Sequence, residues 1–255
     1  MRFAADPQTG LTRPHGPGIG GAAAAPPHTV LLASLPTEMS EIRYHLDELE
    51  IQRDPNDPRR LLPTFEPGVA SVLDVGCGIG QTLMATEHGD DMLACGVDVD
   101  EAALRHGASL TPRVRFVRAS SERLPFADGS FDMVFSRAAL PWMHIPTALG
   151  EISRVMKPGG HVWLSLVDAN VAWHELGAAI ARRSPRQIVF RAYALLNGAL
   201  FHLTGAQFRY PLKRSRCESF QTASGMLRAM RRVGFVDIRA ERARTLVITA
   251  VKQGR

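Results

Sequence analysis

The sequence predicts an α/β fold whose mostly parallel, seven-stranded sheet is covered by helices on both faces. From residue 69 onward, short apolar runs alternate with stretches of helical periodicity, a pattern typical of a doubly wound parallel sheet. The first run, residues 70–75, enters a turn with glycine at positions 76, 78 and 80. The last two runs, 235–242 and 245–251, are joined by a short connection, which only an antiparallel pair allows. The sequence therefore predicts one antiparallel strand near the C-terminus.

The other elements follow from the same periodicity. Strands are expected at 70–75, 92–97, 114–117, 131–135, 161–167, 235–242 and 245–251, and helices at 79–88, 100–109, 146–156 and 222–233. A further helix is expected at 39–52, and prolines at 55, 58, 63 and 67 indicate a linker. Residues 1–28 are rich in Gly, Pro and Ala, which predicts a disordered tail. Three parts result: the tail at 1–28, a helical segment with linker at 29–68, and the main domain at 69–255.

Composition favours a globular cytoplasmic protein without a metal site. The chain has 255 residues, of which 45% are hydrophobic, enough to bury a core. Its cysteines, Cys77, Cys95 and Cys217, are too few and too scattered for a disulfide framework or a zinc site. The N-terminus lacks the apolar run of a secretory signal, and no segment is apolar enough to predict a membrane span. The oligomeric state stays open.

The glycine-rich turn indicates a nucleoside site. Glycine is required where the backbone takes a positive φ or where a ligand touches the main chain, and the following helix offers its N-terminus. A dinucleotide fingerprint would place its third glycine at position 81, where this chain has Gln81, so NAD fits poorly. A tight turn without a ligand is the alternative.

Polar residues follow the next two expected strands. Asp98 comes 18 residues after Gly80, where a carboxylate can accept hydrogen bonds from both ribose hydroxyls. The neighbouring Asp100 suits a helix N-cap better. Ser120 and Ser121 follow the third strand and could contact an adenine edge. Leu124 or Phe126 could pack on the face of the base, whereas residues 128–131 suit an ordinary turn and core positions.

Four segments, in this order, resemble the class I S-adenosylmethionine-dependent methyltransferases, and among them the ubiquinone/menaquinone-biosynthesis-like small-molecule branch. The segments are residues 73–80, 96–98, 124–132 and 151–160. The resemblance implies a Rossmann-like fold and S-adenosyl-L-methionine as the methyl donor. It departs from the family at Ser120, where many members carry Asp. The cofactor-binding residues that it implies are Asp74, Gly76, Cys77, Gly78, Gly80, Asp98, Val99, Ser120, Ser121 and Arg137.

The acceptor side is expected to follow the fourth strand, at residues 136–144. Trp142 is predicted to wall the pocket, and His144 is the candidate general base, needed only if the nucleophile must lose a proton. A structural or surface role for His144 is the alternative. The segment lacks the Asn/Asp-Pro-Pro-aromatic signature of enzymes that methylate nucleobase amino groups, which counts against a nucleic-acid substrate.

An insert at residues 171–216 separates the fifth and sixth strands. It holds eight basic residues and one acid, Glu175, for a net charge of +7, whereas the rest of the chain has 22 basic against 24 acidic residues. We predict helices that form a mobile cap over the carboxyl ends of the strands. A basic amphipathic cap favours an acidic substrate, or peripheral contact with an anionic membrane that carries a lipophilic one. An arginine-rich solvated face over an ordinary core is equally compatible.

These observations predict a methyltransferase that acts on a small, lipophilic or acidic molecule. Two alternatives stay open: a non-catalytic nucleoside-binding or assembly protein with the same fold, and an RNA methyltransferase that uses the basic insert.

Overall fold

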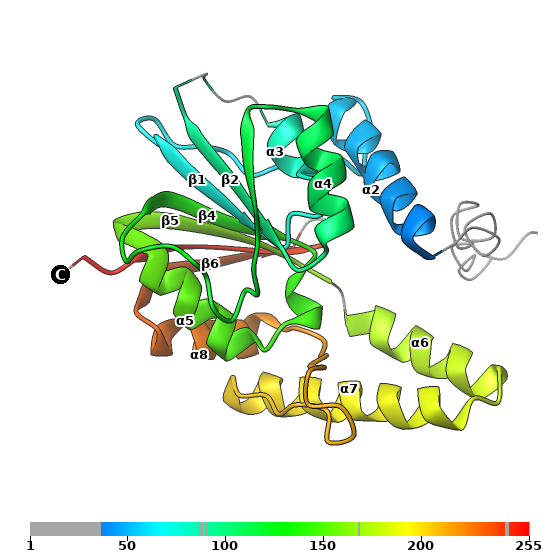
Figure 1. Cartoon of the computed structure of the whole chain (residues 1–255). Helices are drawn as coiled ribbons and strands as arrows, with labels where there is room; N and C mark the ends of the chain where they lie inside the picture. Colours follow the sequence, from blue (N-terminus) through cyan, green and yellow to red (C-terminus); the bar gives the residue numbers. More distant parts are fainter. Residues whose placement is uncertain (1–36, 87–88, 90, 168, 243–244, 255) are drawn as a thin grey trace, which may run out of the picture. The chain divides into compact units, whose positions relative to one another are not determined.

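The computed structural model describes residues 37–86, 89, 91–167, 169–242 and 245–254. Their centre is one seven-stranded sheet with the order β3-β2-β1-β4-β5-β7-β6 (Figure 1). Strand β7 is antiparallel to both of its neighbours, while the pairs among β1 to β5 are parallel. This confirms the predicted sheet. The strands are β1 (Ser71–Val75), β2 (Leu93–Asp98), β3 (Val114–Arg118), β4 (Phe131–Arg137), β5 (Met156–Leu166), β6 (Phe235–Arg242) and β7 (Leu246–Lys252).

Helices cover both faces of the sheet because side chains alternate along each strand. On β1, Leu73 and Val75 point into the larger core and Val72 into a second one. The larger core includes α5 (Ile145–Val155) and α8 (Ala223–Arg232). Helix α3 (Gln81–Ala85) contributes Leu83 to the second core. Helix α2 (Thr37–Arg53) packs against α3 and, less extensively, against α4 (Glu101–Leu110).

Two predicted boundaries differ from the structure by more than two residues. Strand β5 begins at Met156 rather than at 161, because Met156 pairs with Phe131 across a register shift in β4. Residues 157–160, which follow the helix predicted at 146–156, therefore belong to the strand. Helix α3 ends at Ala85 rather than at 88, since its C-cap Thr86 is already extended. The tail predicted at 1–28 and the first part of the segment predicted at 29–68, residues 29–36, lie outside the described residues.

The insert forms two helices, α6 (Ala169–Ala181) and α7 (Pro185–Thr204), which pack together and extend from the sheet in Figure 1. Phe190, Tyr193 and Ala194 form a small core of their own with Tyr210. Phe201 joins α7 to the main core and lies against Gly225 of α8. None of the helices in the described ranges is long and apolar enough to cross a bilayer.

The sheet order creates a crevice at its centre. The chain leaves β1 toward β2 on one side and later returns to β4 on the other, so neighbouring connections diverge at the carboxyl ends of β1 and β4. Open α/β sheets bind ligands at such a switch point.

Candidate active site

The loop after β1 has the conformation that its glycines predict. Gly76, Gly78 and Gly80 all take positive φ, at 79°, 56° and 82°. A side chain at Gly76 would also collide with the Cβ of Ala139. The backbone N–H groups of Gly76 and Cys77 donate to the Val97 carbonyl at 2.8 and 3.1 Å, which fixes the loop against β2.

Asp98 and Asp100, at the end of β2, accept hydrogen bonds from different parts of the chain. The Asp98 carboxylate accepts hydrogen bonds from the N–H groups of Gly78 at 2.9 Å and Asp100 at 3.0 Å. Asp100 accepts from the N–H groups of Ala102 and Ala103 at 2.9 and 3.3 Å and so caps α4. The predicted cap is confirmed. Asp98 is left at the crevice, tied to the glycine loop.

A cavity of about 300 Å³ lies at this point, and we call it the donor cavity. Five of the predicted cofactor residues line it: Gly76, Asp98, Val99, Ser120 and Ser121. The β4–α5 connection and the insert complete its wall, with Ala139, Trp142, Met143 and Ser215 among the lining residues. The structure thus brings together residues from four strand ends and from the insert.

Leu124 and Phe126 do not lie on this cavity, which corrects the suggestion that either packs on a base. Leu124 is 3% exposed and belongs to the main core. Phe126 packs edge-to-face on Phe131, with 4.9 Å between the ring centroids. The turn expected at 128–131 is present, with Gly129 at a φ of 64°. The apolar residues of this segment therefore serve packing.

Asp74 presents a buried carboxylate whose Oδ1 finds no hydrogen-bond partner among the residues that the structure describes. Burial raises its pKa to about 8, against the opposing charge of Arg137. An unsatisfied buried acceptor is costly, so a cationic or hydrogen-bond-donating ligand at this end of β1 would be favoured. The donor set of Asp74, Asp98 and the glycine loop therefore fits S-adenosylmethionine, which carries an ammonium, a sulfonium and a ribose.

Helix α2 covers the same end of the glycine loop. The Glu48 carboxylate pairs with the Arg137 guanidinium at 2.8 Å, and Arg137 Nε also donates to Thr82 Oγ1 at 3.0 Å. The His45 ring lies so close to Gly78 that a Cβ there would come within 2.5 Å of it. Burial lowers the pKa of His45. Arg137 thus faces α2 and is outside the lining of the donor cavity.

The remaining predicted residues are placed as follows. Cys77 is buried, and burial raises the pKa of its thiol well above the usual value. His144 occupies the N-cap of α5. Its Nδ1 lies 2.8 Å from Thr147 Oγ1 and its Nε2 lies 3.4 Å from the Gln207 carbonyl oxygen. Both ring nitrogens therefore have protein neighbours.

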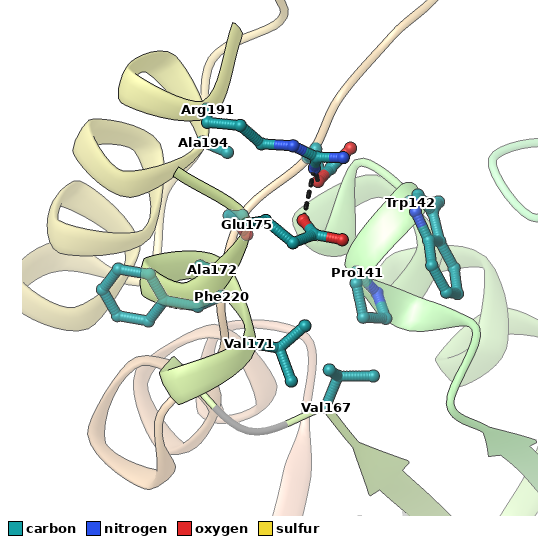
Figure 2. Close-up of a pocket in the computed structure, with 11 residues that line it drawn as sticks. Pro141, Trp142, Val167, Val171, Ala172, Glu175, Arg191, Ala194 and Phe220 are labelled. Atoms are coloured by element: carbon teal, nitrogen blue, oxygen red, sulfur yellow. Dashed lines mark hydrogen bonds and ion pairs between the residues drawn. The ribbon is translucent and has the colours of Figure 1, made fainter. Parts of the chain in front are cut away.

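A smaller cavity, about 70 Å³, lies between the β4–α5 connection and the insert (Figure 2). Trp142 lines both this cavity and the donor cavity, as expected for a wall residue. On the insert side, the Arg191 guanidinium pairs with Glu175 at 2.7 Å and also with Glu218. Burial raises the pKa of Glu218. We call this the acceptor-side cavity.

Residues 73–164 match the sequence model of a family described as a methyltransferase domain. The chain carries a methyltransferase domain. All the cofactor residues predicted from the sequence fall inside this matched range.

Several curated relatives of the methyltransferase domain are named for a small molecule or a carrier-bound group. A malonyl-[acyl-carrier protein] O-methyltransferase of Erwinia pyrifoliae is 35% identical over 143 residues, 53% of each chain. A trans-aconitate 2-methyltransferase of Deinococcus radiodurans is 31% identical and covers 65% of this chain and 64% of that one. A 2-methyl-6-phytyl-1,4-hydroquinone methyltransferase of Synechocystis is 37% identical over 39% of this chain and 32% of its own. The chain spans about half the length of the malonyl relatives that it matches.

The fold extends beyond the matched sequence. Human N-acetylserotonin methyltransferase, solved in complex with S-adenosylmethionine, superposes with a TM-score of 0.54 at 18% identity, over 91% of this chain and 60% of that one. Likeness at this level shows the common architecture.

Two contributions to the donor cavity were not predicted from the sequence. Ser215, near the end of the insert, lines the cavity. Arg209, also in the insert, pairs with Glu122, which lines the cavity after β3. The insert was expected to cap the carboxyl ends of the strands, but no residue of it was assigned to the donor side. The excess of basic residues in the insert was a signal for a contact with Glu122, but no sequence pattern identifies the partner.

Proposed function

We propose that this protein transfers a methyl group from S-adenosylmethionine to a small, acidic or lipophilic molecule. The observation that carries the proposal is the donor cavity, because Asp98 and the left-handed glycine loop meet there at the switch point of a methyltransferase domain. The proposal concerns the whole chain, of which the matched domain is the central part.

Residues that line the donor cavity and residues beside it would bind different parts of the methyl donor. Asp98 and Val99 would hold the ribose, and Ser120 and Ser121 the base edge, with Gly76 contributing backbone. Asp74 would receive the ammonium of the amino-acid end, since its Oδ1 lacks a partner in the described part of the chain. Cys77, Gly78 and Gly80 shape the loop, and Arg137 acts at this end by holding Glu48 of α2.

The chain's own contribution to transfer would be positioning. S-adenosylmethionine supplies a methyl group already activated on a sulfonium, so placing the nucleophile correctly provides most of the rate gain. Trp142 lines both cavities, so an acceptor in the acceptor-side cavity would meet the donor across this residue.

An acidic acceptor suits the surroundings of His144. An ionised carboxylate has no proton to lose, so its methylation needs no general base. This agrees with a His144 ring whose two nitrogens already have neighbours. Two of the relatives are named for malonyl and trans-aconitate, which carry carboxyl groups, and a third for a phytyl hydroquinone, which is lipophilic.

Binding and transfer are tested separately. Calorimetry with S-adenosylhomocysteine measures the donor site, and Asp98→Ala is expected to weaken binding at least about 100-fold, because a charge-assisted contact and the loop anchor are lost together. Asp128→Ala is the control, since this side chain is 81% exposed before the start of β4, at the opposite edge of the sheet. Unchanged affinity in Asp98→Ala would remove the ribose assignment.

Transfer is measured with labelled S-adenosylmethionine and a native small-molecule extract, followed by mass identification of the product. A labelled product that is absent with Asp98→Ala supports the proposal. Tight binding without any labelled product would instead favour a non-catalytic nucleoside-binding protein, and label recovered only in RNA would favour an RNA methyltransferase.

A further inference from the structure

The outer side of α7 is apolar from Val189 to Leu203. Val189, Leu196 and Leu203 are 54%, 67% and 68% exposed. Their spacing of seven residues places them on one side of the helix, with Ala192 and Ala199 between them. None of these five positions carries a polar or charged residue. A helix side that faces water is normally polar, so this side indicates a non-aqueous contact.

A hollow of about 670 Å³ continues this side at the first turn of α7. Val189 and Leu212 supply apolar walls, and Leu212 is 80% exposed. Arg186, Lys213 and Arg216 supply the charged walls, and no acidic residue of the described chain lines the hollow. Apolar and cationic side chains therefore share one surface.

The charge of the insert is only partly neutralised within the fold. Arg191 pairs with Glu175 and Glu218, and Arg209 pairs with Glu122. Five further basic residues are exposed, and no salt bridge is found for them within residues 37–254 as described. They are Arg182, Arg183, Arg186, Lys213 and Arg214. They gather at the tip of the hairpin and in the loop beside the first turn of α7.

We propose that the outer side of α7, together with the hollow at its first turn, docks on an anionic lipid bilayer. The stripe from Val189 to Leu203 measures about 21 Å at 1.5 Å per residue, which suits a helix lying along the membrane interface. The exposed cations at one end would face the lipid headgroups. Figure 1 shows the hairpin extending from the sheet, which leaves it accessible. This inference does not depend on methyl transfer.

The same features disfavour other occupants. A second copy of the chain would bring one strongly cationic insert against another, which like-charge repulsion opposes. An acidic protein would require cations distributed along its contact surface, whereas the stripe between Val189 and Leu203 has none. An anionic bilayer suits both the apolar stripe and the exposed cations, because it offers apolar chains beneath anionic headgroups.

Vesicle flotation of the full chain tests the proposal. Vesicles of phosphatidylcholine and phosphatidylglycerol in a 7:3 ratio are compared with pure phosphatidylcholine, at low salt and at several-fold higher salt. We expect flotation with the anionic vesicles at low salt, at least about tenfold weaker affinity at high salt, and little binding to the neutral ones, because headgroup attraction is screened by salt.

Paired variants assign the surface. Leu196→Glu with Leu203→Glu is expected to weaken vesicle affinity at least about tenfold. Arg186→Gln with Lys213→Gln is expected to weaken it about 25-fold, from about 1 kcal/mol per cation and a tenfold change per 1.4 kcal/mol. Matched controls are Leu110→Glu at the end of α4 and Arg231→Gln with Arg232→Gln in α8, all at exposed positions. Circular dichroism confirms that each variant is folded.

Three results would overturn the proposal. One is the absence of flotation with anionic vesicles at low salt, and another is flotation that neither paired variant reduces. The third is a dimer in sedimentation equilibrium that Leu196→Glu with Leu203→Glu abolishes while vesicles are not bound, which would assign the surface to a second copy of the chain.

Discussion

Asp74 is buried at the end of β1 that faces the proposed donor site, and burying its carboxyl group there costs free energy. Its pKa of about 8 lies above the ordinary value because burial disfavours the charged form. The folded state therefore holds a proton that the unfolded chain releases near pH 4. The resulting stabilisation is complete below that pH and is lost as the pH rises toward 8.

We predict that Asp74→Asn flattens this pH dependence. Urea unfolding at pH 5.5 and pH 8.0 measures the effect. The free energy of unfolding should be lower at pH 8.0 than at pH 5.5 in the wild type, and the variant should not share this loss. Equal slopes in the two proteins would contradict the raised pKa.

The same carboxyl makes donor binding dependent on pH. An ammonium group binds the ionised form of Asp74, so the affinity for S-adenosylhomocysteine should rise by up to about tenfold per pH unit below 8. Calorimetry at pH 6, 7 and 8 measures this effect. In Asp74→Asn the affinity should be weaker and nearly constant over the range, and a retained rise would place the titrating group elsewhere.

At the level of residues, spacing in the sequence predicted backbone contacts such as a helix cap. It predicted less well what surrounds each side chain. Asp100 was separable from Asp98 because a cap must directly precede its helix. The sequence could not show that Asp98 also anchors the Gly78 N–H, since that contact joins two loops. Leu124 was placed wrongly because an apolar residue beside a crevice fits a ligand face and a core equally well.

Helix α2 is held over the glycine loop by the pair of Glu48 and Arg137. Their side chains are 20% and 12% exposed, so the ion pair is shielded but not dry. We predict that Glu48→Ala lowers the free energy of unfolding by about 1–2 kcal/mol, because Arg137 loses its charged partner while solvent screens part of the cost.

Urea unfolding with a double-mutant cycle measures this pair. Glu50→Ala, at an exposed position of the same helix, is the control and should change stability by less than about 0.5 kcal/mol. Additive losses in Glu48→Ala and Arg137→Ala would show that the pair contributes no coupling.

Helix α7 is fastened to the main core through Phe201, which is fully buried. Phe201→Ala is expected to cost about 3–5 kcal/mol, because it removes buried area and leaves a cavity. Leu203→Ala, two residues on and 68% exposed, should change the free energy of unfolding by less than about 0.5 kcal/mol. Thermal and urea unfolding of the two variants measure the contrast, and similar losses would mean that Phe201 packs loosely.

At the level of elements, most strands and helices could be predicted because apolar periodicity is local. The β6–β7 hairpin followed from connection length alone. The early start of β5 could not be predicted, because it depends on Met156 pairing with Phe131 from another strand. The end of α3 was equally hidden, since a continuous helical pattern carries no clear stop signal before residue 88.

At the level of the whole molecule, the insert reaches both cavities. Ser215 lines the donor cavity, and Arg209 pairs with Glu122 at its rim. We predict that saturating S-adenosylhomocysteine slows hydrogen exchange in residues 209–216 as well as in 74–80, because a bound ligand restricts both walls. Mass spectrometry of peptides from these segments measures the exchange.

Arg209→Gln tests whether residues 209–216 and residues 74–80 respond to the ligand independently. The variant should lose most of the protection in 209–216 while residues 74–80 remain protected by the ligand. Protection of 74–80 alone in the wild type would show that the insert does not respond to the donor.

The seven-stranded, mostly parallel sheet was predictable because its strands and helices follow a local pattern of apolar residues. The closure by residues 209–216 was not, since it brings the end of the insert back across about 90 positions of sequence to Glu122. Contacts between residues so far apart in the sequence produce no periodic pattern of residues from which they could be predicted.

Residues 209–216 carry side chains of two kinds, and this has a thermodynamic consequence. Ser215 faces the donor cavity, while Lys213 and Arg216 line the hollow proposed to meet lipid. Any restriction that a bilayer places on this loop then alters the affinity for the methyl donor. Reciprocity requires the donor to change the affinity for the bilayer by the same factor. Anionic lipid would act as an effector of the methyl-donor site, and the methyl donor would in turn change how strongly the protein binds the membrane.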